Sequence, residues 1–286
     1  MKILVLGASG MVGNAMMRVL SEETGWWVGG TVRNAESKQY FPPQLRQRLK
    51  EGSDVKNLDA LVNVFDEMQP DVVINCVGLI KQRREAKDPL TSILINALVP
   101  HRLAGLCKLS GARLIHISTD CVFSGERGNY TEKDNPDAGD LYGKTKILGE
   151  VLYPHTVTVR TSLIGEELNT QYQLLAWFLA QSEKCKGYTR AVFSGLPTVV
   201  FAQVIRDKVI PNVDLSGLFH ITANPINKHD LLQLIAKVYG KQIDIIPDEQ
   251  LVVDRSLDGS LFHQVTGFTA PDWESLIKTM HAYQRG

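Results

Sequence analysis

A tyrosine and a lysine stand four residues apart at Tyr142 and Lys146, downstream of Thr119. On a helix, residues i and i+4 share one face, so the phenol and the ammonium would lie side by side. A nearby ammonium favours phenolate, so we expect a lowered pKa that makes Tyr142 a proton donor or acceptor near neutral pH. With the Thr119 hydroxyl as a further donor, the set could protonate a carbonyl oxygen while a nicotinamide delivers hydride. A chance pairing on a half-buried helix is the alternative.

The segment from Gly7 to Gly13 follows an apolar run and precedes a helical pattern. Gly7 permits a tight turn, Gly10 lets the backbone approach a pyrophosphate, and Gly13 allows close packing of the helix on the strand. The free N–H groups at the start of a helix also favour phosphate. The segment therefore predicts a dinucleotide site, with a purely structural turn as the alternative. The residues expected to bind the cofactor are Gly7, Ser9, Gly10, Met11, Val12 and Gly13.

The second predicted strand ends in Thr31-Val-Arg33-Asn34 and carries no carboxylate there. Sites that prefer NAD usually have an Asp or Glu at this edge, which binds the ribose 2′-hydroxyl. A guanidinium instead suits a 2′-phosphate in shape and charge. Arg33 therefore favours NADP(H), with NAD(H) as the other option. A solvated surface arginine is the competing interpretation.

The elements that must position these residues alternate between short apolar runs and helical patterns over the first 160 residues. Runs rich in Val, Ile and Leu are typical of strands covered on both faces, and their alternation with helices is typical of a doubly wound parallel sheet. The predicted strands are Ile3–Leu6, Trp26–Val32, Val72–Cys76, Leu114–Ser118 and Thr156–Arg160. The predicted helices are Val12–Glu22, Leu58–Met68, Leu90–Leu109 and Leu141–Leu152. We expect an α/β fold of the Rossmann type, carrying the catalytic residues, over residues 1–165.

Beyond Ile164 the pattern changes to helices with scattered short strands. The predicted helices are Tyr172–Glu183, Val199–Ile210, Lys228–Tyr239 and Trp273–Tyr283. We expect residues 166–286 to form a smaller, mostly helical lobe that binds the substrate. Because no Pro/Gly-rich linker separates the two parts, the boundary is soft and the parts are expected to interleave.

The composition is that of an ordinary globular protein, with 44% hydrophobic and 22% charged residues. Lys plus Arg (31) balance Asp plus Glu (31), so the basic charge of a nucleic-acid binder is missing. The four cysteines form no CxxC and no metal-ligand spacing with the histidines, so we expect free thiols and no metal. No segment approaches the ~18 apolar residues of a membrane span, and the first residues are too short an apolar run for a signal peptide. We expect a cytoplasmic protein that binds neither nucleic acid nor membrane.

Four motifs occur in the order and at the spacing of a known family. They are Gly7–Gly13, Asn75-Cys-Val-Gly78, Ser118-Thr-Asp120 and Tyr142-Gly-Lys-Thr-Lys146. With them the sequence resembles the extended short-chain dehydrogenases/reductases over residues 1 to about 165. The longer runs Ser118–Gly125 and Tyr142–Glu150 are most similar to nucleotide-sugar reductases of the dTDP-4-dehydrorhamnose reductase family. Beyond residue 165 the resemblance is carried mainly by Gly217–Thr222.

The resemblance implies a function and a set of site residues. It implies NADPH-dependent reduction of the 4-keto group of a nucleoside-diphosphate 4-keto-6-deoxy sugar, a step of deoxysugar biosynthesis, with Thr119, Tyr142 and Lys146 as catalytic residues. The implied cofactor contacts are Asp54, Val55, Cys76, Val77, Gly78, Asn96, Tyr142 and Lys146. The candidate substrate contacts are Asp120, Cys121, Val122 and Lys81. The family commonly has Tyr at the position of Cys121. Lys81 belongs to a basic run, 81–84, that could meet the sugar-nucleotide diphosphate or be a solvated loop.

Two other functions fit the same fold. An epimerase of nucleotide sugars would retain NAD and consume no added NADPH, and a regulatory subunit would bind the dinucleotide without turnover. The complete set of Thr119, Tyr142 and Lys146 favours an enzyme over such a subunit, because a sensor needs no proton donor. Sugar dehydratases of the superfamily carry Asp-Glu after the threonine, whereas Cys121 follows Asp120 here. The oligomeric state is left open, with a homodimer among the options.

Overall fold

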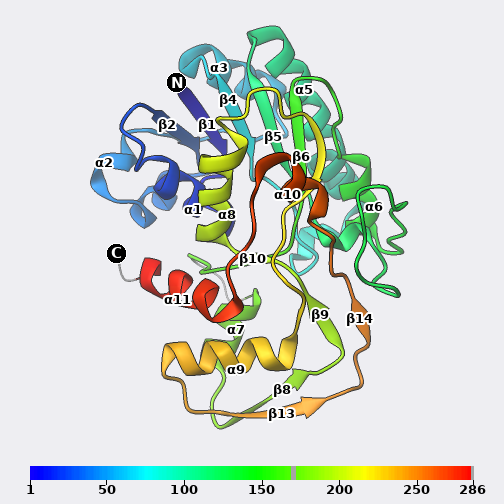
Figure 1. Ribbon diagram of the computed structural model, residues 1–286. Helices are drawn as coiled ribbons and strands as arrows, with labels where there is room; N and C mark the ends of the chain where they lie inside the picture. The colour runs from blue at the N-terminus through cyan, green and yellow to red at the C-terminus, as the bar shows by residue number, and fades with distance from the viewer. Residues whose placement is uncertain (169–171, 285–286) are drawn as a thin grey trace.

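The fold is built on a seven-stranded sheet in which neighbouring strands are parallel (Figure 1). The computed structural model describes residues 1–168 and 172–284. In spatial order the strands are β11 (Gly217–His220), β6 (Thr156–Arg160), β5 (Arg113–Ile117), β4 (Val72–Asn75), β1 (Lys2–Leu6), β2 (Trp27–Thr31) and β3 (Leu49–Lys50). The strand order reverses between β1 and β4. Open α/β sheets bind ligands at the carboxyl ends of the strands at such a switch point.

Helices cover both faces of the sheet. One face carries α1 (Met11–Leu20), α8 (Thr198–Val204) and α11 (Trp273–Gln284), and the other carries α3 (Leu58–Met68) and α5 (Val99–Ser110). Strand β1 serves both layers because successive side chains of a strand point to opposite faces. Ile3 and Val5 pack with α1 and α8, whereas Leu4 and Leu6 pack with α3 and α5. The predicted doubly wound sheet is confirmed, and its five predicted strands are all present.

Further helices and turns complete the fold. The remaining α-helices described are α2 (Pro43–Arg46), α4 (Pro89–Ser92), α6 (Leu141–Leu148), α7 (Leu174–Ala180), α9 (Lys228–Tyr239) and α10 (Ser260–Thr266). The 3-10 turns are η1 (Ala35–Tyr40), η2 (Arg84–Lys87) and η4 (Asp120–Val122), and the π-helical turns are η3 (Ile93–Leu98) and η5 (Ile205–Val209).

The predicted helix Leu90–Leu109 is continuous but changes geometry in its middle, where α4 passes into η3 and then into α5. Pro100 has no N–H to donate to the carbonyl of Asn96, so the α-helical hydrogen bond is missing at this point. A π-turn is the local structure that accommodates such a gap, and π-turns are frequent at functional sites. The turn carries Asn96 toward the loop after β4.

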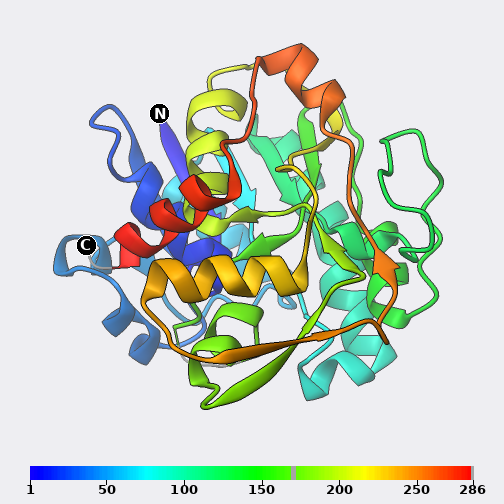
Figure 2. The ribbon, with the colours of Figure 1, turned by 60° about the horizontal axis from the view of Figure 1, so that its bottom comes forward.

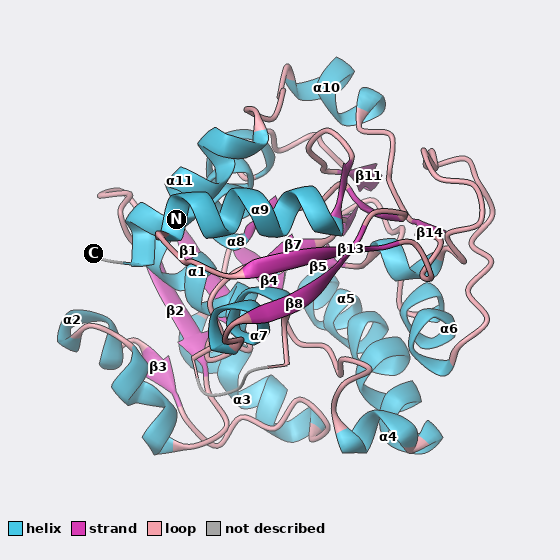
Figure 3. Ribbon diagram, turned by 90° about the horizontal axis from the view of Figure 1, so that it is seen from below, coloured by secondary structure: helices cyan, strands magenta, loops and turns pink. Residues whose placement is uncertain are grey.

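The part of the chain after residue 165 contains helices and several short strands. Besides β11, the strands of this part are β8 (Lys184–Tyr188), β9 (Ala191–Phe193), β10 (Leu196–Pro197), β12 (Ile226–Asn227), β13 (Asp244–Asp248) and β14 (Val253–Asp254), and β7 (Leu163–Ile164) stands just before it. Figure 3 shows α9, β8 and β13 crossing in front of the central strands when the molecule is seen from below, and Figure 2 brings α9 forward in the same way. Three elements of this part lie in the layers of the sheet itself: strand β11 and the covering helices α8 and α11. The division at residue 165 stays a prediction.

One helical segment, Pro89–Ser110, is 22 residues long and apolar enough to cross a membrane by length and composition alone. The sequence pattern had predicted no such segment, because polar residues such as Asn96 and His101 interrupt it. The signal is weak, since a core helix of a globular protein meets the same criterion. Here Val99, Leu103 and Cys107 pack in the hydrophobic cluster beneath the sheet.

Candidate functional site

The glycine loop lies between the end of β1 and the start of α1, at the switch point of the sheet. Gly7 has a φ of +78°, which favours glycine, and its carbonyl accepts a hydrogen bond from Gly10 N at 3.0 Å. A Cβ at Gly13 would lie 2.1 Å from the Gly7 carbonyl oxygen, so only glycine fits there. A Cβ at Gly10 would meet that oxygen at 3.3 Å and otherwise open space. The geometry therefore leaves room for a phosphate beside Gly10, at the start of a helix.

A cavity of about 680 Å³ extends from this loop along the carboxyl edge. Among the residues predicted to bind a cofactor, those that line it are Gly7, Ser9, Gly10, Arg33, Asp54, Val55, Cys76, Val77 and Gly78. Met11 and Gly13 do not line it, and Val12 lines a neighbouring cavity instead. The cavity joins the glycine loop to the ends of β2 and β4, which is where dinucleotides bind in open α/β sheets.

Asn96 lies behind the wall of this cavity rather than on it. Its side chain is buried, accepts a hydrogen bond from Leu79 N at 2.8 Å and donates to Leu79 O at 3.1 Å. It also donates to the Thr145 hydroxyl at 3.3 Å. Asn96 therefore ties the loop after β4 to helix α6, and its direct contact with a cofactor stays a prediction.

Two arginines face the same cavity without a charged partner in the described part of the chain. Arg33 is exposed at the end of β2, and Arg83 is half-buried in the loop after β4. The neighbouring lysines differ, because Lys38 pairs with Glu51 at 3.2 Å and Lys56 pairs with Asp54 at 3.3 Å. From the sequence, the basic run 81–84 could meet the sugar-nucleotide diphosphate or be a solvated loop. In the structure this run divides, with Arg83 on the cofactor side and Lys81 on the other.

A second cavity, of about 230 Å³, holds the predicted catalytic residues. Thr119 follows β5, and Tyr142 and Lys146 lie one turn apart on α6, whose N-cap Asp140 accepts a hydrogen bond from Gly143 N at 2.7 Å. All three side chains line the cavity. The two cavities share Cys76, Val77 and Gly78, so the glycine loop and the catalytic set open onto one groove.

The ionisation of the tyrosine differs from the prediction. Burial raises the pKa of Tyr142, the Cys121 thiol adds to the rise, and a hydrogen-bonding interaction with Thr119 only partly opposes it. The prediction of a lowered pKa is wrong because removal from water outweighs any help from the lysine. The Lys146 ammonium is itself buried and donates to the Ile117 carbonyl at 2.8 Å. Burial lowers the pKa of Lys146 to about 8, although Glu150 works against the shift.

The candidate substrate residues do not all reach the catalytic cavity. Asp120 and Cys121 line it, and Asp120 accepts a hydrogen bond from the Thr119 hydroxyl at 3.1 Å. Lys81 lines it too, paired with Asp140 at 3.0 Å and lying 5.7 Å from the centre of the Tyr142 ring. Val122 is fully buried in a cluster with Phe123, so it supports the loop from behind.

A buried ion pair that sequence reasoning missed holds the catalytic segments together. Arg160, on β6, makes two hydrogen bonds to Glu150, at 2.8 and 2.7 Å, and both side chains are less than a tenth exposed. Glu150 also accepts a hydrogen bond at 2.7 Å from Ser118, the residue before Thr119. The pair therefore fixes the end of α6 against the ends of β5 and β6. A run of Gly-Glu after a helix gives no local signal that a strand arginine ten residues later will meet it.

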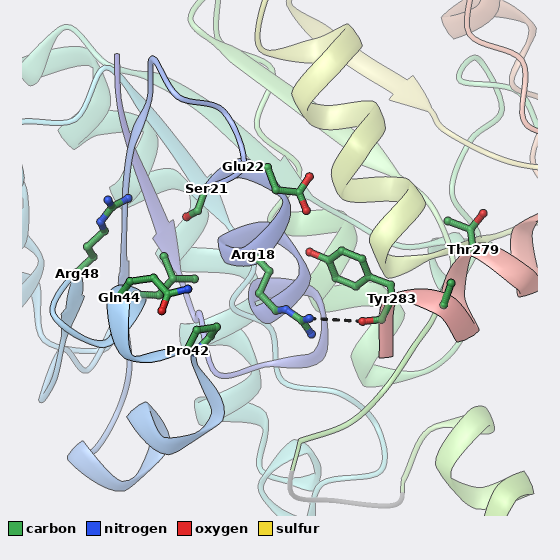
Figure 4. A pocket seen from close by; sticks show the side chains of 10 residues that line it. Arg18, Ser21, Glu22, Pro42, Gln44, Arg48, Thr279 and Tyr283 are labelled. Carbon is green, nitrogen blue, oxygen red and sulfur yellow. Dashed lines mark hydrogen bonds between the residues drawn. The ribbon is translucent and has the colours of Figure 1, made fainter. Parts of the chain in front are cut away.

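A third cavity, of about 710 Å³, lies away from these residues, between α1, α2 and α11 (Figure 4). Arg18 stacks there 4.5 Å from the Tyr283 ring centre and donates to the Tyr283 carbonyl at 3.4 Å. Its lining contains none of the predicted site residues. The smaller paired cavities are therefore the candidate active site, because they bring together the glycine loop and the proton donors.

A parallel sheet with a glycine loop after its first strand, and a Thr-Tyr-Lys set at its carboxyl edge, defines an extended short-chain dehydrogenase/reductase. The chain belongs to the family described as the RmlD substrate binding domain, whose model matches residues 1–284.

Relatives in this family carry several activities in their names. The chain is 24% identical to a dTDP-4-dehydrorhamnose reductase of Aggregatibacter actinomycetemcomitans over 255 residues, 80% of this chain and 87% of that protein. It is 33% identical to a probable low-salt glycan biosynthesis reductase of Haloferax volcanii over 151 residues, 52% of this chain and 48% of the relative. It is 30% identical to methionine adenosyltransferase 2 subunit beta of Mus musculus over 149 residues, 52% of this chain and 41% of that protein. The match thus spans less than half of the last two relatives.

Solved structures share the whole fold. A dTDP-4-dehydrorhamnose reductase ortholog of Clostridium acetobutylicum superposes with a TM-score of 0.82 at 25% identity, over 100% of both chains. The reductase of Bacillus anthracis, solved in complex with NADP, superposes with a TM-score of 0.79 at 20% identity, over 99% of this chain and 98% of that one.

Proposed function

We propose that this chain is a cytoplasmic reductase that uses NADPH to reduce the 4-keto group of a nucleoside-diphosphate 4-keto-6-deoxy sugar. The observation that carries the proposal is the wall of Cys76, Val77 and Gly78 shared by the two cavities. A dinucleotide lying along the glycine loop would reach this wall with its nicotinamide end, beside the Thr119–Tyr142–Lys146 set. The names of the full-length relatives support the same reaction.

The bound nicotinamide would supply hydride to the carbonyl carbon. Tyr142 gives its proton to the carbonyl oxygen, and the Thr119 hydroxyl, on turning from Asp120 to the substrate, donates a second hydrogen bond that fixes this oxygen. The Lys146 ammonium faces the charge that Tyr142 acquires and can bond a ribose hydroxyl. The raised pKa of Tyr142 supports this direction, because the phenol stays protonated at neutral pH and is ready to donate.

The residues at the cofactor cavity fit a phosphorylated dinucleotide. Gly10 and the N–H groups at the start of α1 would hold the pyrophosphate, since no acidic residue stands in the first turn of this helix. Arg33 and Arg83, which lack charged partners in the described part of the chain, would hold the 2′-phosphate. The reductase of similar fold solved with NADP supports this choice of cofactor.

A second function rests on the relation to methionine adenosyltransferase 2 subunit beta. A chain of this family could serve as a subunit that binds a dinucleotide without turning over a sugar. The complete catalytic set favours the enzyme.

The decisive experiment is a panel of nucleoside-diphosphate 4-keto-6-deoxy sugars incubated with NADPH, followed by absorbance of the reduced nicotinamide. Oxidation that depends on one sugar is the expected result. Dinucleotide binding without oxidation for any sugar would favour the subunit. Sugar interconversion without net oxidation would favour an epimerase.

Cofactor choice gives the first prediction. A charge-assisted contact to the 2′-phosphate is worth roughly 1.5–3 kcal/mol, or about one to two decades of affinity. We expect NADPH to bind at least about tenfold more tightly than NADH, and Arg33→Ala to remove most of the gap. Dissociation constants for both cofactors in one buffer measure it. Arg84→Ala, an exposed change outside the cavity lining, is the control. Equal affinities in the parent would contradict the assignment; a gap closed only by Arg83→Ala would move it to Arg83.

A further inference from the structure

Lys228 is a partly buried cation without a charged partner among the residues that the structure describes. It is the first residue of α9, after the N-cap Asn227, which accepts a hydrogen bond from Asp230 N at 2.8 Å. The Lys228 ammonium lies 4.1 Å from the centre of the Phe193 ring. Within residues 1–168 and 172–284, it makes no hydrogen bond or ion pair. By contrast Lys237, on the same helix, has a side chain that is 64% exposed and pairs with Glu274 at 2.9 Å.

This placement of a positive charge costs stability. The N-terminus of a helix carries positive partial charge, so a cation there is repelled. Burial also opposes the charge and lowers the pKa of Lys228 to about 8. The Phe193 ring offsets part of this cost. A charge kept in an unfavourable position indicates a functional role more often than a structural one.

Lys228 does not itself line the catalytic cavity, but the ring that it contacts, Phe193, is linked to a residue that does. The Phe193 ring lies under the Lys228 ammonium. Two residues further along the chain, Gly195 packs closely against Ser162, because a Cβ on Gly195 would lie 2.0 Å from the Ser162 carbonyl oxygen. Ser162 lines the cavity together with Asp120. The Asp120 carboxylate also acts electrostatically on Lys228, although the two form no ion pair. Lys228, in the part of the chain after residue 165, therefore lies within electrostatic reach of Asp120, the residue after Thr119.

The Lys228 ammonium and the Asp120 carboxylate do not form an ion pair with each other. A ligand group that both donates and accepts a hydrogen bond would be complementary to the two. A sugar hydroxyl does both, since its hydrogen can go to Asp120 while its oxygen accepts from Lys228. A diphosphate would suit the ammonium but would be repelled by the carboxylate. The site beside Thr119 is also where the sugar, rather than the diphosphate, must present its carbonyl.

We propose that Lys228 binds a hydroxyl of the substrate sugar, opposite Asp120, and thereby helps to set sugar specificity. The inference rests on the proposed function. It assigns to α9 a direct contact that no motif in the sequence indicated, because the chemistry comes from two segments that are distant in the chain.

Calorimetric titration of the NADP⁺-saturated protein tests the inference without relying on turnover. The probes are dTDP, which lacks the sugar, and dTDP-rhamnose, the product of the proposed reaction. Lys228→Met should weaken dTDP-rhamnose roughly 10- to 100-fold and leave dTDP within about twofold, because a hydrogen bond to a charged group is lost only with the sugar. Lys228→Arg keeps the charge and should retain part of the affinity. Lys237→Met, the same change on the same helix, should alter neither.

The outcomes separate the two proposals. Equal weakening of dTDP and dTDP-rhamnose would place Lys228 on the nucleotide and overturn the sugar contact, as would unchanged affinity for both. If the parent protein binds neither probe, a dTDP-linked substrate is excluded, and the inference fails with it. Thermal unfolding adds an independent readout: Lys228→Met should keep or raise the Tm, because it removes a poorly solvated charge. A lowered Tm would indicate that Lys228 is structural.

Discussion

Burial shifts the pKa values of Tyr142 and Lys146, two of the ionisable side chains of the catalytic cavity, in opposite directions. It raises the pKa of Tyr142 and lowers the pKa of Lys146 to about 8. At neutral pH Tyr142 therefore keeps its proton and Lys146 keeps its charge. A protonated phenol on the same helix face as an ammonium can protonate a developing alkoxide, and the ammonium then faces the phenolate. The two shifts together keep a proton on Tyr142 and a charge on Lys146 near neutral pH, which is the protonation state that reduction requires.

Removal of the phenol hydroxyl should separate catalysis from binding. We expect Tyr142→Phe to lower turnover by about 10²–10⁴-fold, the usual contribution of a general acid. Cofactor affinity should stay close to the parent value, because the glycine loop and Arg33 are untouched. Steady-state rates with the active sugar and a dissociation constant for NADPH measure both. Turnover within a factor of ~3 of the parent would exclude Tyr142 as the acid.

The lowered pKa of Lys146 predicts a pH limit on activity. The ammonium is present below about pH 8 and is lost as the pH rises through that value, so its stabilisation of phenolate is lost in the same direction. We expect kcat/KM for reduction to be level below this pH and to fall about tenfold per pH unit above it. Lys146→Arg, which stays charged, should lack this alkaline fall at whatever rate it retains. A profile that stays level well above pH 8 in the parent would show that the charge is not needed.

At the scale of the elements, two glycines of the glycine loop, Gly13 and Gly10, have different roles. Gly13 is required by packing, because a Cβ would lie 2.1 Å from the Gly7 carbonyl oxygen. Gly10 is not, because its backbone is extended and an added Cβ would meet that oxygen at 3.3 Å. Gly13 is therefore required by the fold, whereas the space beside Gly10 is free for a ligand.

This difference makes a paired prediction. Gly10→Val should leave a folded protein that no longer binds dinucleotide, because the side chain would occupy the space for pyrophosphate. Gly13→Ala should lower the free energy of unfolding by about 1–3 kcal/mol, the usual cost of overpacking. Denaturant unfolding and calorimetric titration measure the two effects. Gly25→Val, where a Cβ meets nothing within 4 Å, is the control. Unchanged cofactor affinity in a folded Gly10→Val protein would contradict the assigned phosphate site.

The elements also show how far the sequence predicts this structure. The glycine loop and the five strands β1, β2, β4, β5 and β6 follow from local patterns, and they are present. Strand β3 has only two residues, and β11 has only two apolar side chains among its four residues. Neither strand therefore has enough apolar pattern to be predicted. The site is predicted where a motif is local, as with Tyr142 and Lys146. It is missed where burial or distant partners decide, as with the pKa of Tyr142, and with Arg83 and Lys228.

At the scale of the whole molecule, the two parts of the chain do not separate along the sequence. Helix α8 packs in the same hydrophobic cluster as α1, and β11 pairs with β6 along Gly217–His220. Both elements follow residue 165, yet both complete the layers that surround the glycine loop. The proposed substrate lobe therefore contributes to the fold of the cofactor site.

Truncation tests this dependence. We expect residues 1–165 alone to show no cooperative thermal unfolding, because Met16 and Met17 on α1 would lose the cover of α8 and β6 would become an open edge. Near-ultraviolet circular dichroism of the fragment, compared with the full chain, measures fixed packing. A cooperative transition in the fragment would establish residues 1–165 as an independent domain.

The late arrival of β11 has a consequence for synthesis on the ribosome. Strand β6, Thr156–Arg160, emerges early and pairs with β5 on one side only. Its other edge stays open until Gly217–His220 has been made, which takes several seconds at ~5–20 residues per second. During this interval the nascent chain presents an unpaired, Val- and Thr-rich strand edge, the kind of surface that templates aggregation. The nascent chain is therefore most exposed to aggregation between the synthesis of β6 and the synthesis of β11, and a chaperone that binds in this interval would protect it most.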